Sequence, residues 1–121
     1  MTEPDSDDER DERIRNKIIV DAYTPDEQAI SWCYYLESKL LVPFEAECIE
    51  RRAFSPLQEG ELVTVVGMID EVVQEMFVEI EWKDRQFGVP LAQLQPLNPD
   101  PETKEAVNDW HYWEGDGTRI Q

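Results

Sequence analysis

Residues 61–97, ELVTVVGMIDEVVQEMFVEIEWKDRQFGVPLAQLQPL, hold the pattern that decides the fold. Three short apolar runs lie within this stretch, at Leu62–Met68, Met76–Trp82 and Gln86–Leu91. In the middle run, apolar residues alternate with a second face made of Phe77, Glu79 and Glu81. A period of two residues is typical of an antiparallel strand with one buried face. We therefore expect a small β-sheet that displays carboxylates on its outer face and in its loops.

Another strand is expected before this stretch, and a single helical turn near its end. Phe44–Arg52 alternates apolar residues with glutamates and predicts the first strand of the sheet. Gln58-Glu59-Gly60 predicts a turn, Lys83-Asp84 a tight hairpin, and Leu91–Leu94 the helical turn after the last strand. Four short strands with these connections predict a small SH3-like antiparallel β-barrel.

Two helices are expected to flank the barrel, which makes the fold class α+β. Residues 24–27, TPDE, predict the start of an N-terminal amphipathic helix, with a threonine cap, a proline at the first position and a glutamate that completes a capping box. Pro43 ends this helix. Its apolar residues recur at three- and four-residue steps: Ala29, Trp32, Cys33, Leu36 and Leu40. Asp100-Pro101 predicts the start of a C-terminal helix that runs toward His111.

The chain divides into an acidic tail and one domain. Residues 1–13 contain seven acids, two arginines and no apolar residue after Met1. Such a segment cannot bury enough surface to offset its loss of conformational entropy. We expect residues 1–16 to form a disordered acidic tail and residues 17–121 to form a single domain. The segment Ile14–Tyr23, which crosses the boundary between tail and domain, is expected to be extended and docked on the domain.

The charge of the chain restricts its partners. Twenty-eight Asp and Glu face eleven Lys and Arg, a formal charge of −17. This charge repels nucleic acids and anionic membranes and attracts metal ions or a basic protein. The sequence contains no apolar run of 18 residues and no signal-peptide pattern, so we expect a cytoplasmic protein and a monomer. Cys33 and Cys48 lie on apolar faces and suggest buried, reduced thiols, although a disulfide between them stays open.

Catalytic and zinc-binding patterns are missing from the sequence. The single histidine, His111, stands among aromatic residues and is interpreted as a packed structural residue. The sequence has no glycine-rich phosphate loop, nucleophile elbow or HExxH pattern. A structural zinc site needs about four Cys or His ligands, and the chain has three such residues. We therefore expect a protein that is not an enzyme.

Carboxylates remain as the candidate chemistry, and calcium is the cation that suits them. Calcium accepts six to eight oxygen ligands in flexible geometry, whereas magnesium demands a stricter octahedron. An EF-hand does not fit, because Arg10 stands where its glycine belongs. Residues 70–75 bring three acids together in one connection between strands. The predicted ligands are Asp70, Glu71 and Glu75 first, then Glu79, Glu81, Asp84 and Asp116. A solvated acidic loop without a metal is the alternative that the spacing leaves open.

Beyond these patterns, the chain resembles the small cyanobacterial calcium-binding proteins of the CcbP type. The resemblance covers residues of about 18–115 and rests on the combination of several short segments. These are Ile19–Tyr23, Glu27–Ala29, Tyr34–Glu37, Ser55–Leu57, Val65–Met68, Glu75–Ile80, Val89–Leu91 and Asp109–Trp113. It implies calcium binding by clustered surface carboxylates and a role as an intracellular calcium buffer, linked in filamentous members to heterocyst differentiation. No short ligand motif of the family can be carried over to numbered positions.

Two other functions remain as alternatives. An acidic SH3-like adaptor would dock a basic protein partner and respond to calcium only through charge screening. An enzyme with paired carboxylates is a third reading, and it needs a cleft that the sequence does not reveal.

Overall fold

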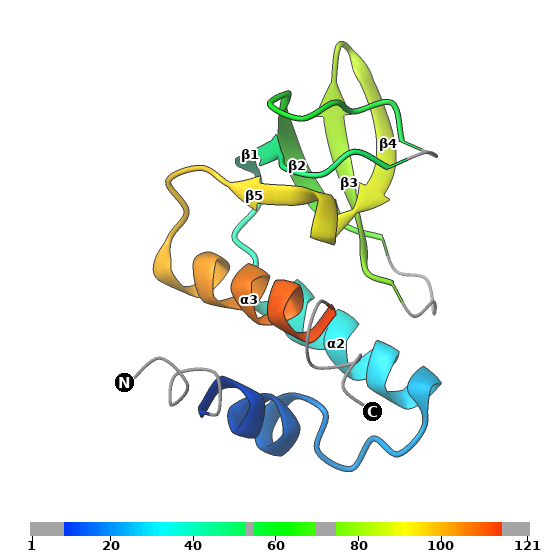
Figure 1. The fold of residues 1–121 in the computed structure, drawn as a ribbon, viewed down its shortest axis with the longest axis vertical. Coiled ribbons are helices and arrows are strands. Elements are labelled where there is room, and N and C mark those ends of the chain that lie inside the picture. Colours follow the sequence, from blue (N-terminus) through cyan, green and yellow to red (C-terminus); the bar gives the residue numbers. More distant parts are fainter. Residues whose placement is uncertain (1–8, 53–54, 70–74, 115–121) are drawn as a thin grey trace.

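The computed structural model describes residues 9–52, 55–69 and 75–114, and it has an α+β architecture with helices beneath an antiparallel sheet (Figure 1). A helical stretch at residues 9–13 comes first. The elements that follow are η1 (Ile14–Ile18, a π-helix), α2 (Pro25–Lys39), β1 (Phe44–Cys48), β2 (Leu62–Met68), β3 (Phe77–Trp82), β4 (Arg85–Pro90), η2 (Leu91–Gln93, a 3₁₀ turn), β5 (Leu94–Pro96) and α3 (Pro101–Tyr112).

The five strands form one sheet in the order β4-β3-β2-β1-β5, with every neighbouring pair antiparallel. β4 and β5 are its two edges, and no pairing between them closes the sheet among the described residues. The described strands therefore form an open antiparallel sheet, and the SH3-like barrel expected from the sequence is not confirmed. The η2 turn leads the chain out of β4, and the three-residue β5 then pairs only with β1.

The strands match the alternation in the sequence. Val63, Val65, Val78 and Ile80 are buried, whereas the residues between them are partly or fully exposed. The β3–β4 hairpin turns at Lys83 and Asp84 as predicted, and both have positive φ, which a two-residue type I′ turn requires. β1 is shorter than expected and ends at Cys48, and β5 was not predicted.

Both predicted helices are present and begin at the predicted caps. Thr24 and Glu27 form the expected capping box at the start of α2. Asp100 accepts hydrogen bonds from the backbone N–H groups of Glu102 and Thr103 at the start of α3. The apolar stripe of α2 is buried as expected: Ala29, Trp32, Cys33, Leu36 and Leu40. Cys33 and Cys48 are buried thiols, and no disulfide joins them.

The N-terminal segment differs from its expected conformation. Ile14–Ile18 is π-helical, so the prediction of an extended segment is wrong there. Within the expected tail at residues 1–16, residues 9–16 are helical, and residues 1–8 lie outside the described part. Ile14 is fully buried, and the nearby Arg13 pairs with the buried Asp109 of α3. A buried anion that pairs with the arginines and the buried side chains of Ile14 and Ile18 account for this docking, and composition alone does not reveal either.

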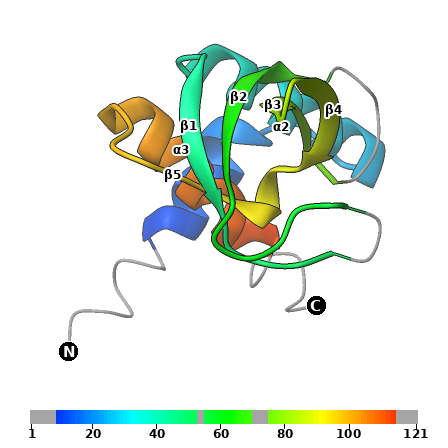
Figure 2. The ribbon, with the colours of Figure 1, turned by 90° about the horizontal axis from the view of Figure 1, so that it is seen from above.

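Helices α2 and α3 lie side by side on one side of the sheet (Figure 1). Figure 2, seen from above, shows α2 beneath the β2–β4 side and α3 beneath the β1–β5 side. Indole rings join the two helices, because the Trp32 centroid lies 5.0 Å from that of Trp110 and 6.2 Å from that of Trp113. Trp82 stands apart, edge-on to Phe87 at the hairpin. None of the described helices has the length and apolar character needed to cross a membrane.

Candidate metal centre

Four of the seven predicted carboxylate ligands belong to the described residues. Glu75 lies two residues before β3, Glu79 and Glu81 lie within β3, and Asp84 lies in the β3–β4 turn. The other predicted ligands, Asp70, Glu71 and Asp116, lie outside the described residues.

Glu75 is held by an arginine from another part of the chain. Arg52 Nη1 donates a hydrogen bond of 3.0 Å to Glu75 Oε2. Arg52 Nε donates a second hydrogen bond, 3.2 Å long, to Oε2 of Glu50, which follows β1. The Arg52 side chain is only 19% exposed and that of Glu75 27%, so this ion pair is partly shielded from water. Charge-assisted hydrogen bonds of this kind are stronger than neutral ones.

The charges around Arg52 keep it protonated. Burial lowers the pKa of Arg52, but the negative charges of Glu75, Glu50 and Glu114 outweigh burial and raise the pKa above its usual value. These three carboxylates come from three separate parts of the fold: the end of β1, the start of β3 and the end of α3. One guanidinium thus neutralises only part of the negative charge of the three carboxylates around it.

Glu79 occupies a different setting on the sheet. Its cross-strand neighbours are Gly67 of β2 and Gly88 of β4, so neither neighbour places a side chain beside its carboxylate. A β-bulge between Val65 and Gly67 interrupts the register next to it. The space above Gly67 is open, whereas Ile69 covers Gly88. Glu79 therefore has room to reorient toward a cation.

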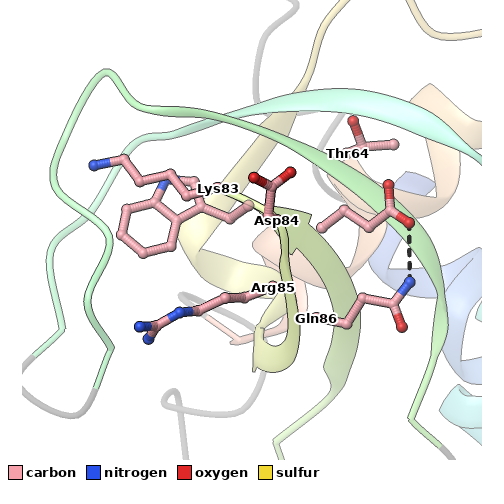
Figure 3. A pocket seen from close by; sticks show the side chains of 7 residues that line it. Thr64, Lys83, Asp84, Arg85 and Gln86 are labelled. Atoms are coloured by element: carbon pink, nitrogen blue, oxygen red, sulfur yellow. Dashed lines mark hydrogen bonds between the residues drawn. The ribbon is translucent and has the colours of Figure 1, made fainter.

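Glu81 and Asp84 line an open hollow of about 660 Å³ at the hairpin (Figure 3). Glu81 Oε2 accepts a hydrogen bond of 2.9 Å from Gln86 Nε2. Lys83 Nζ lies 4.6 Å from the Trp82 ring centroid, a cation–π contact. The full lining is Thr64, Glu81, Trp82, Lys83, Asp84, Arg85 and Gln86. Two acids and two bases share this hollow, which makes it poorly suited to a divalent cation.

The described residues alone do not complete a metal site. No group of three or more His, Cys, Asp or Glu side chains among them is arranged to hold an ion. Successive same-face positions on a strand lie about 7 Å apart, so Glu79 and Glu81 point the same way without converging. Asp84 lies further along the hairpin. The structure places these carboxylates along one strand and its turn but does not bring them to one point.

His111 is packed, in line with the sequence analysis. Its Nε2 atom lies 3.5 Å from the carbonyl oxygen of Leu91. Burial lowers its pKa, and nearby carbonyl oxygens and Glu50 only partly oppose this. The neutral ring is the favoured form at neutral pH, and it joins α3 to the η2 turn.

Three polar residues of this architecture were missed from the sequence. Glu50 and Arg52 follow the first strand, where an adjacent pair of arginines after a run of glutamates was the available signal. Asp109 is fully buried in α3. An acid between the apolar residues Val107 and Trp110 of a helix could have indicated a buried partner.

Comparisons with known proteins identify the family and solved structures of similar fold. The model of the family Calci_bind_CcbP, described as calcium binding, matches residues 12–114. The crystal structure of Anabaena CcbP is 34% identical, with a TM-score of 0.79 over 91% of this chain and 92% of that one. A calcium binding protein solved in its calcium-binding form is 33% identical, with a TM-score of 0.81 over 97% of this chain and 98% of that one. Among curated proteins, none matches the chain. The match spans most of the described fold, from the N-terminal helix to the end of α3, and the chain belongs to the CcbP family of calcium-binding proteins.

Proposed function

We propose that this protein binds calcium and acts as an intracellular calcium buffer. The observation that carries the proposal is the likeness, over nearly the whole chain, to a protein solved in its calcium-binding form. The charge of −17 supports it, because a strongly negative surface raises the local concentration of cations. A non-enzymatic role is consistent with the packed His111 and with the absence of catalytic motifs from the sequence.

The leading ligands in this proposal are Asp70, Glu71 and Glu75, which stand close together in the sequence between β2 and β3. Glu75 supports the assignment through its position, since it is partly shielded and faces an acidic region around Arg52. The second group is Glu79, Glu81, Asp84 and Asp116. Of these, Glu79 is the strongest, because the open space above its neighbour Gly67 leaves its carboxylate room to move. Flexible oxygen-rich sites favour calcium over magnesium.

Several finer points belong to the same proposal. The affinity is expected in the range of about 10⁻⁷ to 10⁻⁴ M, the range of calcium sensors and of weaker calcium sites. The strand order and the 3₁₀ turn before β5 support an SH3-like arrangement that stays open on one side. We further propose a cytoplasmic monomer that avoids nucleic acids and membranes, with a link to heterocyst differentiation where the host forms heterocysts.

Calcium titration by calorimetry tests the function. We expect saturable heat with calcium at physiological salt, and weaker binding with magnesium. A triple variant, Asp70→Asn, Glu71→Gln and Glu75→Gln, should lose at least one site or weaken it strongly. Its matched control is Glu37→Gln, Glu102→Gln and Glu105→Gln, which removes the same charge from exposed positions on α2 and α3 and should bind nearly as the parent does.

The outcomes separate the candidate functions. If the parent protein shows no saturable heat, calcium binding is wrong, and capture of a basic protein by the acidic surface becomes the leading function. If binding is equal in both triple variants, calcium binding stands and the ligand assignment is wrong. Equal heats with magnesium and calcium would also contradict a calcium-selective site.

A further inference from the structure

The environment of Arg52 goes beyond calcium binding itself. A surface arginine usually reaches into water, yet the Arg52 side chain is 19% exposed and bonds two carboxylates that are far apart in sequence. Its partner Glu75 is a leading calcium ligand in the proposed function. The oxygen that Glu75 would offer to calcium thus belongs to a carboxylate that already neutralises a cation of the same chain.

We propose that Arg52 is a built-in competitor of calcium at Glu75 and sets the affinity of the site. The proposal rests on the proposed function, because it requires Glu75 to be a ligand. In the calcium-free protein, the guanidinium occupies one carboxylate oxygen of Glu75 and compensates the surrounding negative charge. When calcium binds, either this hydrogen bond breaks or the guanidinium stays in place and repels the ion. Both events make the binding free energy of calcium less favourable.

The distances place the guanidinium close enough to repel a bound calcium ion. A calcium ion lies about 2.3–2.6 Å from a carboxylate oxygen. Arg52 Nη1 lies 3.0 Å from Glu75 Oε2, so an ion on either oxygen of Glu75 comes within roughly 8 Å of the guanidinium while the hydrogen bond persists. Screening at physiological salt is incomplete over about 8 Å. In water, the repulsion between a divalent and a monovalent cation about 6 Å apart corresponds to a factor of about ten in Kd.

A second cation–carboxylate contact explains why Arg52 stays close to the site after release. Its Nε atom is bonded to Glu50 Oε2 at 3.2 Å, independently of Glu75. If calcium takes Glu75, the guanidinium keeps this anchor and returns when calcium leaves. Arg52 would therefore speed release as well as weaken binding, which suits a buffer that must exchange its ion.

The experiment is a cycle of variants measured by calcium calorimetry. Arg52→Gln should bind calcium about tenfold more tightly than the parent. Lys39→Gln is the charge-matched control. Lys39 ends α2, makes a long contact of 4.0 Å with Glu102 of α3 and lies outside the proposed site. This control should change Kd by less than about twofold. Arg52→Lys keeps the charge and should bind close to the parent.

The double variant Arg52→Gln with Glu75→Gln completes the cycle. In the Glu75→Gln background, replacing Arg52 should have no more effect than replacing Lys39. Urea unfolding without calcium shows whether each variant is folded, and Arg52→Met, which also removes the charge and should also bind about tenfold more tightly, replaces Arg52→Gln if that variant is not folded.

Failure of the inference is distinct from failure of the proposed function. If the parent binds no calcium, or if Glu75→Gln leaves Kd unchanged, the function or its ligand assignment fails. If Glu75→Gln weakens binding but Arg52→Gln binds as Lys39→Gln does, the competition is absent. Weaker binding by Arg52→Gln would show that Arg52 instead holds Glu75 in a binding position, which also overturns the inference.

Discussion

At the scale of single residues, Asp109 is a buried carboxylate whose stability depends on its hydrogen-bond partners. It is fully buried, and its carboxylate accepts hydrogen bonds from Arg13 at 2.7 and 3.0 Å and from the Tyr35 hydroxyl at 2.8 Å. Arg10 adds an ion pair at 3.1 Å. Burial, followed by the hydrogen bond to Asp109, raises the pKa of Tyr35, so its hydroxyl remains a donor at any working pH. A buried charge is stable only with such a full set of partners.

Replacing this carboxylate should be costly. Asp109→Asn leaves Arg10 and Arg13 facing a neutral amide, and we expect a loss of about 3 kcal/mol in the free energy of unfolding. Glu105→Gln is the control, because Glu105 is exposed and lies 3.6 Å from Arg13, and it should change stability by less than about 0.5 kcal/mol. Urea unfolding without calcium measures both. A loss for Asp109→Asn as small as that expected for Glu105→Gln would contradict a stabilising role of the buried carboxylate.

Residue types are readable from a sequence, but partners across the fold are not. His111 was assigned to packing because aromatic residues surround it, and the structure agrees. Arg13 and Asp109 are 96 positions apart, and nothing local in either segment names the other. The same limit applies to Arg52 and Glu75, which are 23 positions apart. The charges were evident from the sequence, whereas their pairing follows from the tertiary fold.

At the scale of elements, predictions from the sequence were confirmed where a helix cap or a turn depends only on residues close together in the chain. The cap of α2, the cap of α3 and the β3–β4 turn all depend on residues within a few positions of each other, and all three were predicted. Ile14–Ile18 was predicted to be extended from its β-branched residues, but it docks as a π-helix with Ile14 and Ile18 buried. Tertiary burial there outweighed local propensity.

The glycines that flank Glu79 give a matched test of strand packing. A methyl group at Gly88 would overlap the Cδ1 atom of Ile69, so Gly88→Ala should lose about 1 kcal/mol in the free energy of unfolding. A methyl group at Gly67 meets no neighbour within 4 Å, so Gly67→Ala should be neutral or slightly stabilising. Thermal unfolding without calcium compares them. The opposite order of stability would contradict the packing of Ile69 over β4.

At the scale of the whole molecule, the charge of −17 opposes the compact state. We expect the melting temperature to rise when NaCl increases from about 20 to about 150 mM, because the Debye length shortens to about 8 Å. Calcium should add to this effect by binding the folded state, by about 2.7 kcal/mol at a hundred times its Kd. Calcium and sodium chlorides at equal ionic strength form the comparison, and identical melting temperatures would leave screening as the only effect.

The overall architecture was predictable only in part. Alternation and turn chemistry identified the strands β2, β3 and β4 and the antiparallel sheet. The three-residue β5 is too short to produce a periodic pattern, and it pairs with β1, so that β4 and β5 lie at opposite edges of the described sheet. Most candidate ligands were predicted from the high number of acidic residues in residues 70–84. Whether their carboxylates converge on one ion could not be predicted, and described carboxylates such as Glu79 and Glu81 lie along one strand rather than around a point.

The distribution of the tryptophans has an optical consequence. Trp32, Trp110 and Trp113 are all at most 5% exposed and lie within one ring cluster between α2 and α3. Trp82 is alone at the hairpin, beneath the ammonium group of Lys83. Near-ultraviolet circular dichroism of the native protein therefore reports on the helical layer through coupled indoles. Emission from Trp82 reports on the sheet, so a Trp82→Phe variant resolves the two layers spectroscopically without an added label.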